Sequence, residues 1–171
     1  KLGGNINSEY LTSAPTAEQV FYTSNLTNAT SAAHIGNIGQ RLGFLNTTAN
    51  RTVPVLAVST ADRQQITIKY DINLQRVNSD RVLGVQLQYR IGTEGNFIPV
   101  EESTEVFTGT GSGANTSGTE TAEVRTKQIT LPADVAFKEN VQFRWVTARL
   151  QGGSGDNLGF SIDNVEVTGI T

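Results

Sequence analysis

The sequence predicts an all-β protein: one antiparallel β-sandwich of two sheets with jelly-roll topology. Several stretches alternate apolar and polar residues with period two, which is the pattern of a strand that buries one face. No long window repeats its apolar residues at the helical period of about 3.6. The sequence also has no internal repeat of the kind that marks solenoids or propellers, so two sheets packed face to face are the simplest way to bury these strands.

The first half of the chain contains the clearest strand. Pro15 to Tyr22 fits either a short helix, with Pro15 in its first turn, or an opening strand. Val53 to Ser59 is a β-branched run and is predicted to be a short strand. Gln65 to Arg76 alternates without a break, and Val82 to Ile91 follows a polar hinge as its antiparallel partner.

Three more strands are expected in the second half. Glu123 to Leu131 alternates and is closed by Pro132. Val141 to Val146 alternates next, and Phe160 to Val167 forms the last strand with a parity change that predicts a β-bulge near Asp163 and Asn164. The residues expected to face the interior are Ile66, Ile68, Tyr70, Ile72, Leu74, Val85, Leu87, Phe143 and Ile162.

Composition sets limits on the class of protein. The 171 residues fit one domain, residues 1–171, and a chain that begins at Lys1 is expected to be a module of a longer protein. A net charge of -3 with 13 scattered Lys and Arg residues gives no basic surface for nucleic acid. No apolar run approaches the ~20 residues that span a bilayer, so membrane insertion is not expected. The sequence has no cysteine, which excludes disulfides and thiolate metal sites. We expect the protein to be a monomer.

Five segments, in their order, resemble a known type of module. They are Gly36–Gly43, Ile66–Tyr70, Leu87–Arg90, Phe143–Trp145 and Phe160–Val165. The pattern is similar to the jelly-roll accessory modules of bacterial secreted nucleases and other exported multidomain proteins. Its closing strand also resembles that of MAM domains and of carbohydrate-binding jelly rolls. The resemblance implies a noncatalytic extracellular or cell-surface module that works beside neighbouring domains of its parent protein.

Asp163 is the candidate metal ligand. A carboxylate inside an apolar strand must be paired, hydrogen-bonded or metal-bound. Calcium prefers oxygen ligands, and Asp163, Asp156, Asn157 and Asn164 could supply some of them, with a hydrogen bond from loop backbone to Asp163 as the alternative. The resemblance implies that such an aspartate holds a structural calcium ion shared with the N-terminal segment, where Glu9 or Asn7 would contribute.

Enzyme chemistry is not predicted. His34 is the single histidine and lies in a polar region, and the adjacent Glu101 and Glu102 would point to opposite faces of a strand. A carbohydrate site would need an exposed aromatic ring with amide or charged neighbours. The candidates are Trp145, Tyr89 and Tyr70. Trp145 shares a strand face with Val141 and Phe143 and so also fits the core, and Tyr70 and Tyr89, as expected cross-strand neighbours in the two best strands, fit the core as well.

The sequence therefore predicts a noncatalytic binding or accessory module. Its expected ligand is a polysaccharide or other glycan, and its expected role is to target or space an attached domain. The alternative is a purely structural or adhesive module of a bacterial surface protein, without a small ligand. A sheet face lined by Trp or Tyr would favour the first, and a fully packed Trp145 would favour the second.

Overall fold

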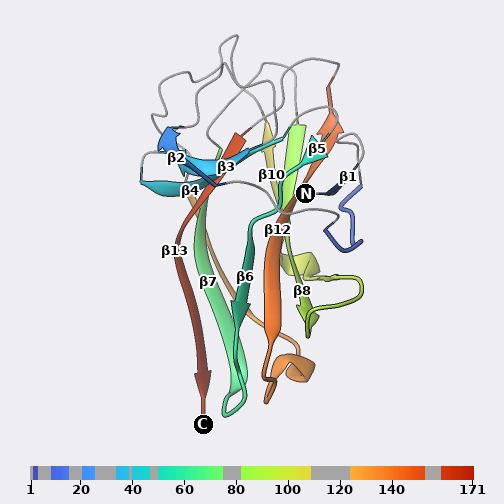
Figure 1. The fold of residues 1–171 in the computed structure, drawn as a ribbon, viewed down its shortest axis with the longest axis vertical. Helices are drawn as coiled ribbons and strands as arrows, with labels where there is room; N and C mark the ends of the chain where they lie inside the picture. Colours follow the sequence, from blue (N-terminus) through green and yellow to red (C-terminus); the bar gives the residue numbers. More distant parts are fainter. Residues whose placement is uncertain are drawn as a thin grey trace.

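The fold is a two-sheet β-sandwich in a computed structural model that describes residues 2–3, 9–15, 21–25, 34–38, 40–46, 50–74, 82–108, 124–152 and 159–171 (Figure 1). The five-stranded sheet consists of β10 (Glu105–Thr108), β8 (Val82–Ile91), β12 (Val141–Gln151) and β6 (Val55–Val58) in that order, with β9 (Ile98–Pro99) beside β8. The six-stranded sheet consists, in order, of β11 (Val124–Thr130), β7 (Gln64–Leu74), β13 (Gly159–Ile170), β4 (Arg41–Leu45), β3 (His34–Ile38) and β2 (Phe21–Asn25). A separate pair joins β1 (Leu2–Gly3) and β5 (Asn50–Arg51).

The strand order is that of a jelly roll. One layer runs β4-β13-β7-β11 and the other runs β6-β12-β8-β10, so the chain passes from one sheet to the other at almost every connection. This is the arrangement of two interlocked Greek keys. All pairs within these two layers are antiparallel, which confirms the predicted fold class. The exception lies outside them, where β2 pairs with β3 in parallel.

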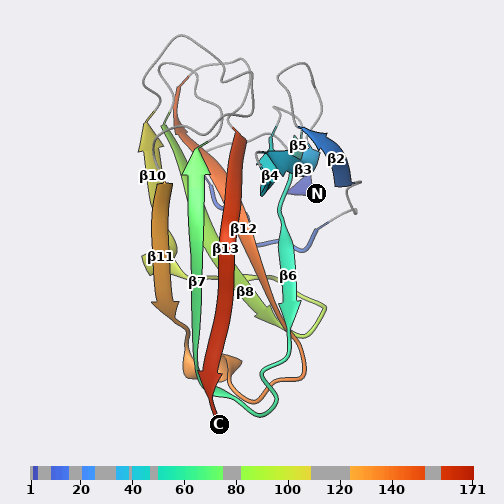
Figure 2. The same cartoon turned by 90° about the vertical axis from the view of Figure 1, so that its left-hand side faces the viewer.

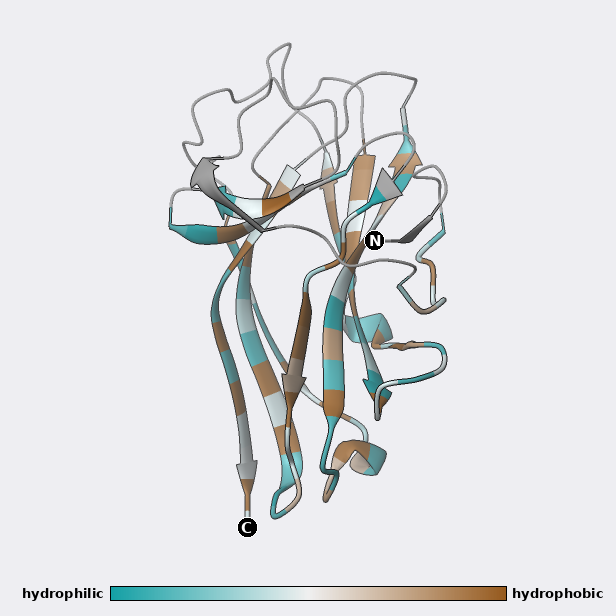
Figure 3. Ribbon diagram, viewed as in Figure 1, coloured by the Kyte–Doolittle hydropathy of each residue, from teal (hydrophilic) through white to brown (hydrophobic). Residues whose placement is uncertain are grey.

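Period-two alternation accounts for the core. Figure 3 shows apolar and polar residues alternating along β7 and β12. One cluster of buried side chains from both sheets contains all nine residues expected inside, together with Phe44, Leu83, Phe107, Trp145 and Phe160. The predicted bulge is also present, because the register between β13 and β7 shifts between Asp163 and Glu166, and Asn164 has a φ of 49°.

The helical segments among the described residues are two short 3-10 turns, η1 (Glu101–Ser103) and η2 (Ala133–Val135). Of the stretch from Pro15 to Tyr22, residues 16–20 lie outside the described residues, and Phe21 and Tyr22 begin strand β2. No helix in the described part of the chain is long and apolar enough to cross a membrane.

The two long edges of the sandwich differ. At one edge β10 lies beside β11, as Figure 2 shows, and Glu105 of β10 accepts hydrogen bonds from Arg125 and Lys127 of β11, each at 2.8 Å. At the other edge, β4 pairs with only the first residues of β13, up to Ile162. The lower half of β13, near the C-terminus, therefore has no strand paired to it on this side in the described structure. A pocket lies there, between the end of β13 and the β6–β7 turn.

Candidate ligand-binding surfaces

The three aromatic residues proposed as a ligand platform lie in the core. Trp145 is 2% exposed, and its ring meets that of Tyr70 edge-on with 5.3 Å between ring centroids. Tyr89 is also buried and donates its hydroxyl to Asp134 of η2 at 3.0 Å. Burial raises the pKa of Tyr70, and burial followed by the hydrogen bond to Asp134 raises the pKa of Tyr89 to about 12. Their strand positions face the opposite sheet, so all three rings take the core position that the sequence left open, and none of them forms a surface platform in the structure.

The candidate metal ligands Asp163 and Asn164 lie on the outer face of the six-stranded sheet, opposite Asp71 of β7. Asp163 accepts the Asn164 backbone N–H at 2.9 Å and pairs with Arg41 Nε at 3.5 Å, with its side chain 40% exposed. Asp71 accepts hydrogen bonds from Thr126 (2.5 Å) and the Asn164 side chain (2.7 Å), which lower its pKa. The structure thus contains hydrogen-bond and ion-pair partners for Asp163.

Calcium binding at Asp163 stays a prediction. Asp156, Asn157 and Asn7 lie outside the described residues, and Glu9 belongs to a segment that contacts the five-stranded sheet. No group of three or more His, Cys, Asp or Glu side chains that could hold a metal ion occurs within the described ranges.

The candidate acid–base residues are placed as follows. Glu101 and Glu102 begin η1 rather than a strand, and Glu101 Oε2 accepts a hydrogen bond of 3.4 Å from Gln86. His34 is the first residue of β3, where its backbone lies opposite Leu45 of β4.

The outer face of the five-stranded sheet carries a polar network instead of an aromatic platform. Fully buried Arg144 donates two hydrogen bonds to Gln88 Oε1, at 2.9 and 2.8 Å, and Gln88 donates to Gln86 at 3.1 Å. Two guanidinium groups lie over the Phe97 ring, with the central carbon of Arg144 3.9 Å and that of Arg90 4.5 Å from the ring centroid. Burial, and then the charge of Arg90, lowers the pKa of Arg144 to about 9. Residues 9–15 contact this face, so it is not open to a ligand in the structure.

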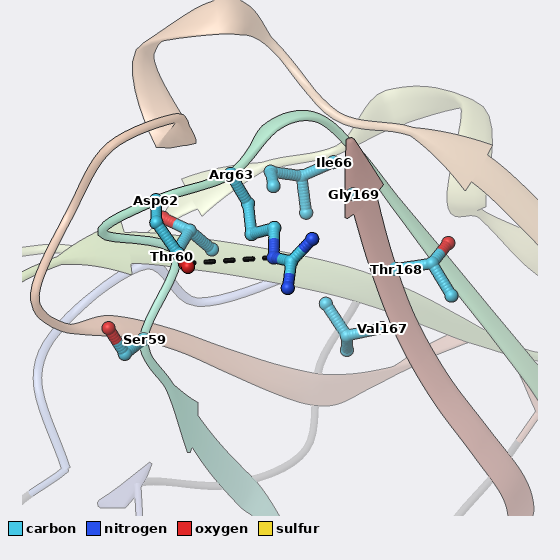
Figure 4. Close-up of a pocket in the computed structure, with 8 residues that line it drawn as sticks. All are labelled: Ser59, Thr60, Asp62, Arg63, Ile66, Val167, Thr168 and Gly169. Carbon is cyan, nitrogen blue, oxygen red and sulfur yellow. Dashed lines mark ion pairs between the residues drawn. The ribbon is translucent and has the colours of Figure 1, made fainter. Parts of the chain in front are cut away.

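Two pockets lie at the lower end of the sandwich. The first, of about 400 Å³, lies between the β6–β7 turn and the end of β13. Figure 4 shows the Arg63 side chain across its middle, with Ile66 and Val167 on either side of the guanidinium group. Arg63 pairs with Asp62 at 3.6 Å and both side chains are solvent-exposed. The rest of the pocket wall consists mainly of the hydroxyl groups and main-chain atoms of Ser59, Thr60, Thr168 and Gly169.

The second pocket, of about 290 Å³, shares Ile66 with the first and is more apolar. Its wall consists of Gln64, Gln65, Ile66, Thr130, Leu131, Pro132, Ala133, Ala136 and Phe137. Phe137 is 59% exposed, the largest exposed fraction among the described large apolar side chains. Its φ of 58° lies in the left-handed region, which bulky residues rarely adopt, and its N–H is held by Arg63 O at 3.0 Å.

Sequence reasoning missed Phe137. It lies between Pro132 and the strand that begins at Val141, outside every alternating stretch, and no pattern in the sequence marks it as exposed. The pocket beside it could not be foreseen, because its wall combines residues 64–66 with residues 130–137.

No protein-family model matches the sequence, and no curated protein matches it either. Among solved structures, the chain is similar to a carbohydrate-binding module specific for non-crystalline cellulose, with a TM-score of 0.41, 13% identity, and coverage of 84% of this chain and 85% of that one. It is also similar to structures of infectious bursal disease virus. The Gx strain gives a TM-score of 0.35 at 14% identity over 68% of this chain and 32% of the viral chain. The Gt strain gives a TM-score of 0.33 at 14% identity over 92% of this chain and 41% of the viral chain. Scores this low assign neither a family nor a ligand.

Proposed function

We propose that the chain is a noncatalytic carbohydrate-binding module whose site is the lower end of the sandwich, at Phe137 and the two pockets beside it. The observation that carries this proposal is the exposed, backbone-strained Phe137. An apolar ring gains nothing from exposure to water, and a non-glycine residue in the left-handed region costs about 1–3 kcal/mol. Such strain persists only where the surrounding structure holds the residue in place, and it clusters at functional sites.

The chemistry around Phe137 fits a sugar. Aromatic rings pack against the C–H faces of sugar rings, while amides and hydroxyls bind sugar hydroxyl groups. The apolar pocket supplies the ring of Phe137 together with the amides of Gln64 and Gln65 and the hydroxyl of Thr130. At about 290 Å³ it is at the small end of the range for ligand pockets, so it suits one sugar unit.

The neighbouring pocket extends the site. Ile66 belongs to both walls, so a chain of sugar units could pass from Phe137 to the pocket at Arg63. Arg63 offers a guanidinium fork, and Ser59 and Thr60 lie beside it. On this proposal the module lies outside the cell and holds an attached domain of its parent protein near a polysaccharide.

A purely structural or adhesive module is the second candidate. It is favoured by the packing of Trp145 inside the core and by residues 9–15 on the outer face of the five-stranded sheet, since neither feature provides a binding surface on a sheet. The two candidates differ in whether the lower end of the sandwich binds a glycan.

The test is retention on a panel of soluble and immobilised polysaccharides, with Phe137→Ala and Phe137→Gly as site variants. Ile98→Ala is the matched control, because Ile98 is an apolar side chain 46% exposed on β9. We expect the wild type and Ile98→Ala to be retained on at least one polysaccharide and both Phe137 variants to lose about tenfold or more in affinity, the loss of one aromatic contact of about 1.4 kcal/mol. Phe137→Gly should keep wild-type stability, because glycine adopts the left-handed backbone freely. No retention of the wild type, or equal retention of all four proteins, would favour the structural module.

A further inference from the structure

Arg63 differs from Arg90, Arg125 and Arg144 in how its guanidinium group is used. Each of those three arginines donates hydrogen bonds from this group to oxygen atoms of the protein. Within the described part of the chain, the Arg63 side chain is paired with Asp62 through Nε at 3.6 Å, which is longer than a hydrogen bond. Its two terminal nitrogens, Nη1 and Nη2, therefore have no acceptor among the described residues.

These two nitrogens lie in the pocket of about 400 Å³ between the β6–β7 turn and the end of β13. Figure 4 shows the guanidinium group with Ile66 and Val167 on either side of it. Ile66 is buried and Val167 packs against the core, so the flanks of the group are apolar, while the Arg63 side chain stays 46% exposed. Charges attract each other more strongly beside apolar walls than in bulk water, because the local dielectric constant is lower. An anion in this pocket is therefore attracted more strongly than an anion at a fully solvated arginine.

A β-bulge and a glycine set the position of the Arg63 stem. The register between β7 and β13 shifts so that Gln65 and Ile66 both lie opposite Gly169, and Gln65 has a φ of 51°. A Cβ atom on Gly169 would lie 3.0 Å from the Cβ of Arg63 and 2.7 Å from Cδ1 of Ile66. Glycine at this position thus lets the Arg63 stem lie against β13. Bulges are common next to functional sites, where they redirect side chains.

We propose that the pocket at Arg63 binds a carboxylate group of the glycan, so that the ligand is a polysaccharide with uronic acid units. The inference rests on the proposed function, because it assigns the chemistry of one of the two pockets of that site. The parallel N–H groups of a guanidinium match the two oxygens of a carboxylate, and such a bidentate pair is stronger than neutral hydrogen bonds. Ser59 Oγ accepts the backbone N–H of Ala61 at 3.3 Å and keeps its own proton for a sugar oxygen.

The other charges of the chain do not produce this preference. The net charge is -3, so a polyanion is not attracted to the molecule as a whole and must be selected by a local site. Asp62 also lines the pocket, but its side chain is 80% exposed and water screens its charge. An exposed ion pair such as Asp62–Arg63 contributes little, so a ligand carboxylate can bind Arg63 without a large opposing cost.

The test compares acidic polysaccharides with neutral polymers of the same backbone. Polygalacturonate, alginate and hyaluronate are each paired with the polymer made by reducing their carboxyl groups to alcohols, and binding of the intact chain is measured by affinity electrophoresis at low salt. We expect at least one acidic polymer to bind about tenfold more tightly than its reduced form, as one partly exposed charge-assisted contact provides. Arg63→Gln should bind both forms equally. Arg63→Lys keeps the charge without the fork and should retain part of the preference.

Lys69→Gln is the matched control, because it removes the same charge from an exposed residue of β7 that lines neither pocket. It should keep the full preference for the acidic form. An equal loss in Lys69→Gln and Arg63→Gln would indicate a general charge effect and overturn the assignment. Equal binding of the acidic and reduced forms of all three polymers would also overturn it, as would a preference for dextran sulfate over dextran with none in the three uronate pairs.

Phe137→Ala separates this inference from the proposed function. A loss of about tenfold on both forms, with the preference for the acidic form intact, would support both. Unchanged affinity of Phe137→Ala for the acidic form, together with loss in Arg63→Gln, would support the carboxylate site and contradict the site at Phe137. Wild-type binding that depends on Phe137 but ignores the carboxyl groups would overturn the carboxylate site alone. No binding to any of the polymers would overturn both.

Discussion

Glu105 joins the two sheets at one edge of the sandwich through a single carboxylate. One oxygen accepts a hydrogen bond from Arg125 and the other from Lys127, and the Arg125 guanidinium also lies 3.9 Å above the Phe107 ring. Burial opposes ionisation of Glu105, but the hydrogen bonds and charges of Lys127 and Arg125 outweigh it and lower the pKa. The ionised form of this one residue therefore stabilises the contact between β10 and β11.

The lowered pKa of Glu105 predicts a pH-dependent contribution to stability. The contribution is complete above the ordinary glutamate pKa of about 4.3 and is lost as the pH falls through the lower pKa of the folded state. Glu105→Gln should lower the free energy of unfolding by about 1–2 kcal/mol near neutral pH, because two charge-assisted hydrogen bonds are weakened. Denaturant titrations at about pH 7 and about pH 2 would measure it. The exposed Glu102→Gln is the control, and a difference that persists undiminished in acid would contradict the assignment.

At Asp163 the prediction concerns calcium. A cation bound only by the folded state stabilises it by about 2.7 kcal/mol at a hundredfold excess over Kd. Added calcium should raise the melting temperature of the wild type and chelator should lower it, while Asp163→Ala should respond to neither. If calcium shifts neither protein, Asp163 serves only as the hydrogen-bond and ion-pair partner of Asn164 and Arg41.

At the scale of the strand, alternation decides which side chains are buried. Residues 66–74 of β7 place their apolar members inside and most of their polar members outside. The bulge at Asp163 and Asn164 then changes the parity of β13, so that Val167 returns to the core while Val165 is exposed. A bulge of this kind bends the strand and increases its twist.

Truncation in the middle of β7 tests this assignment. Ile68 is completely buried, so Ile68→Ala should lower the free energy of unfolding by about 2–5 kcal/mol through lost burial and a cavity. Val55→Ala removes apolar atoms from a side chain that is 45% exposed on β6, and should cost less than about 1 kcal/mol. Chemical denaturation followed by Trp145 fluorescence would compare the two. Equal midpoints would show that Ile68 does not face the core.

At the scale of the whole molecule, the jelly roll brings together strands that are far apart in sequence. The last strand, β13, pairs with both β4 and β7, and β12 pairs with β6 and β8. Few of these contacts can form before long loops have closed, and loop closure costs entropy before the contacts compensate for it. The central strands therefore depend on one another, and the sandwich cannot be assembled from local hairpins alone.

This topology predicts slow folding. Proteins dominated by non-local strand pairing fold in about milliseconds to seconds, whereas helical bundles fold in microseconds to milliseconds. Trp145, the single tryptophan, is buried between the sheets and reports the formation of the core. Stopped-flow refolding should show the Trp145 signal developing on the slower scale. Completion of the signal within the dead time of mixing would contradict the prediction that non-local strand pairing limits the folding rate.

The sequence by itself determined the alternating strands β6, β7, β8, β11, β12 and β13, the inward-facing residues and the bulge, because each depends on a periodicity carried by neighbouring residues. The shorter strands β3, β4, β9 and β10 carry no such pattern and were not predicted. It also predicted the all-β class and its jelly-roll order, and it kept open the core position of Trp145. Only the tertiary structure decided which surfaces are available. Phe137 is exposed because of the turn in which it stands, and the outer face of β8 and β12 is covered because residues 9–15 lie across it. Exposure is set by residues distant in sequence, so no local pattern encodes it.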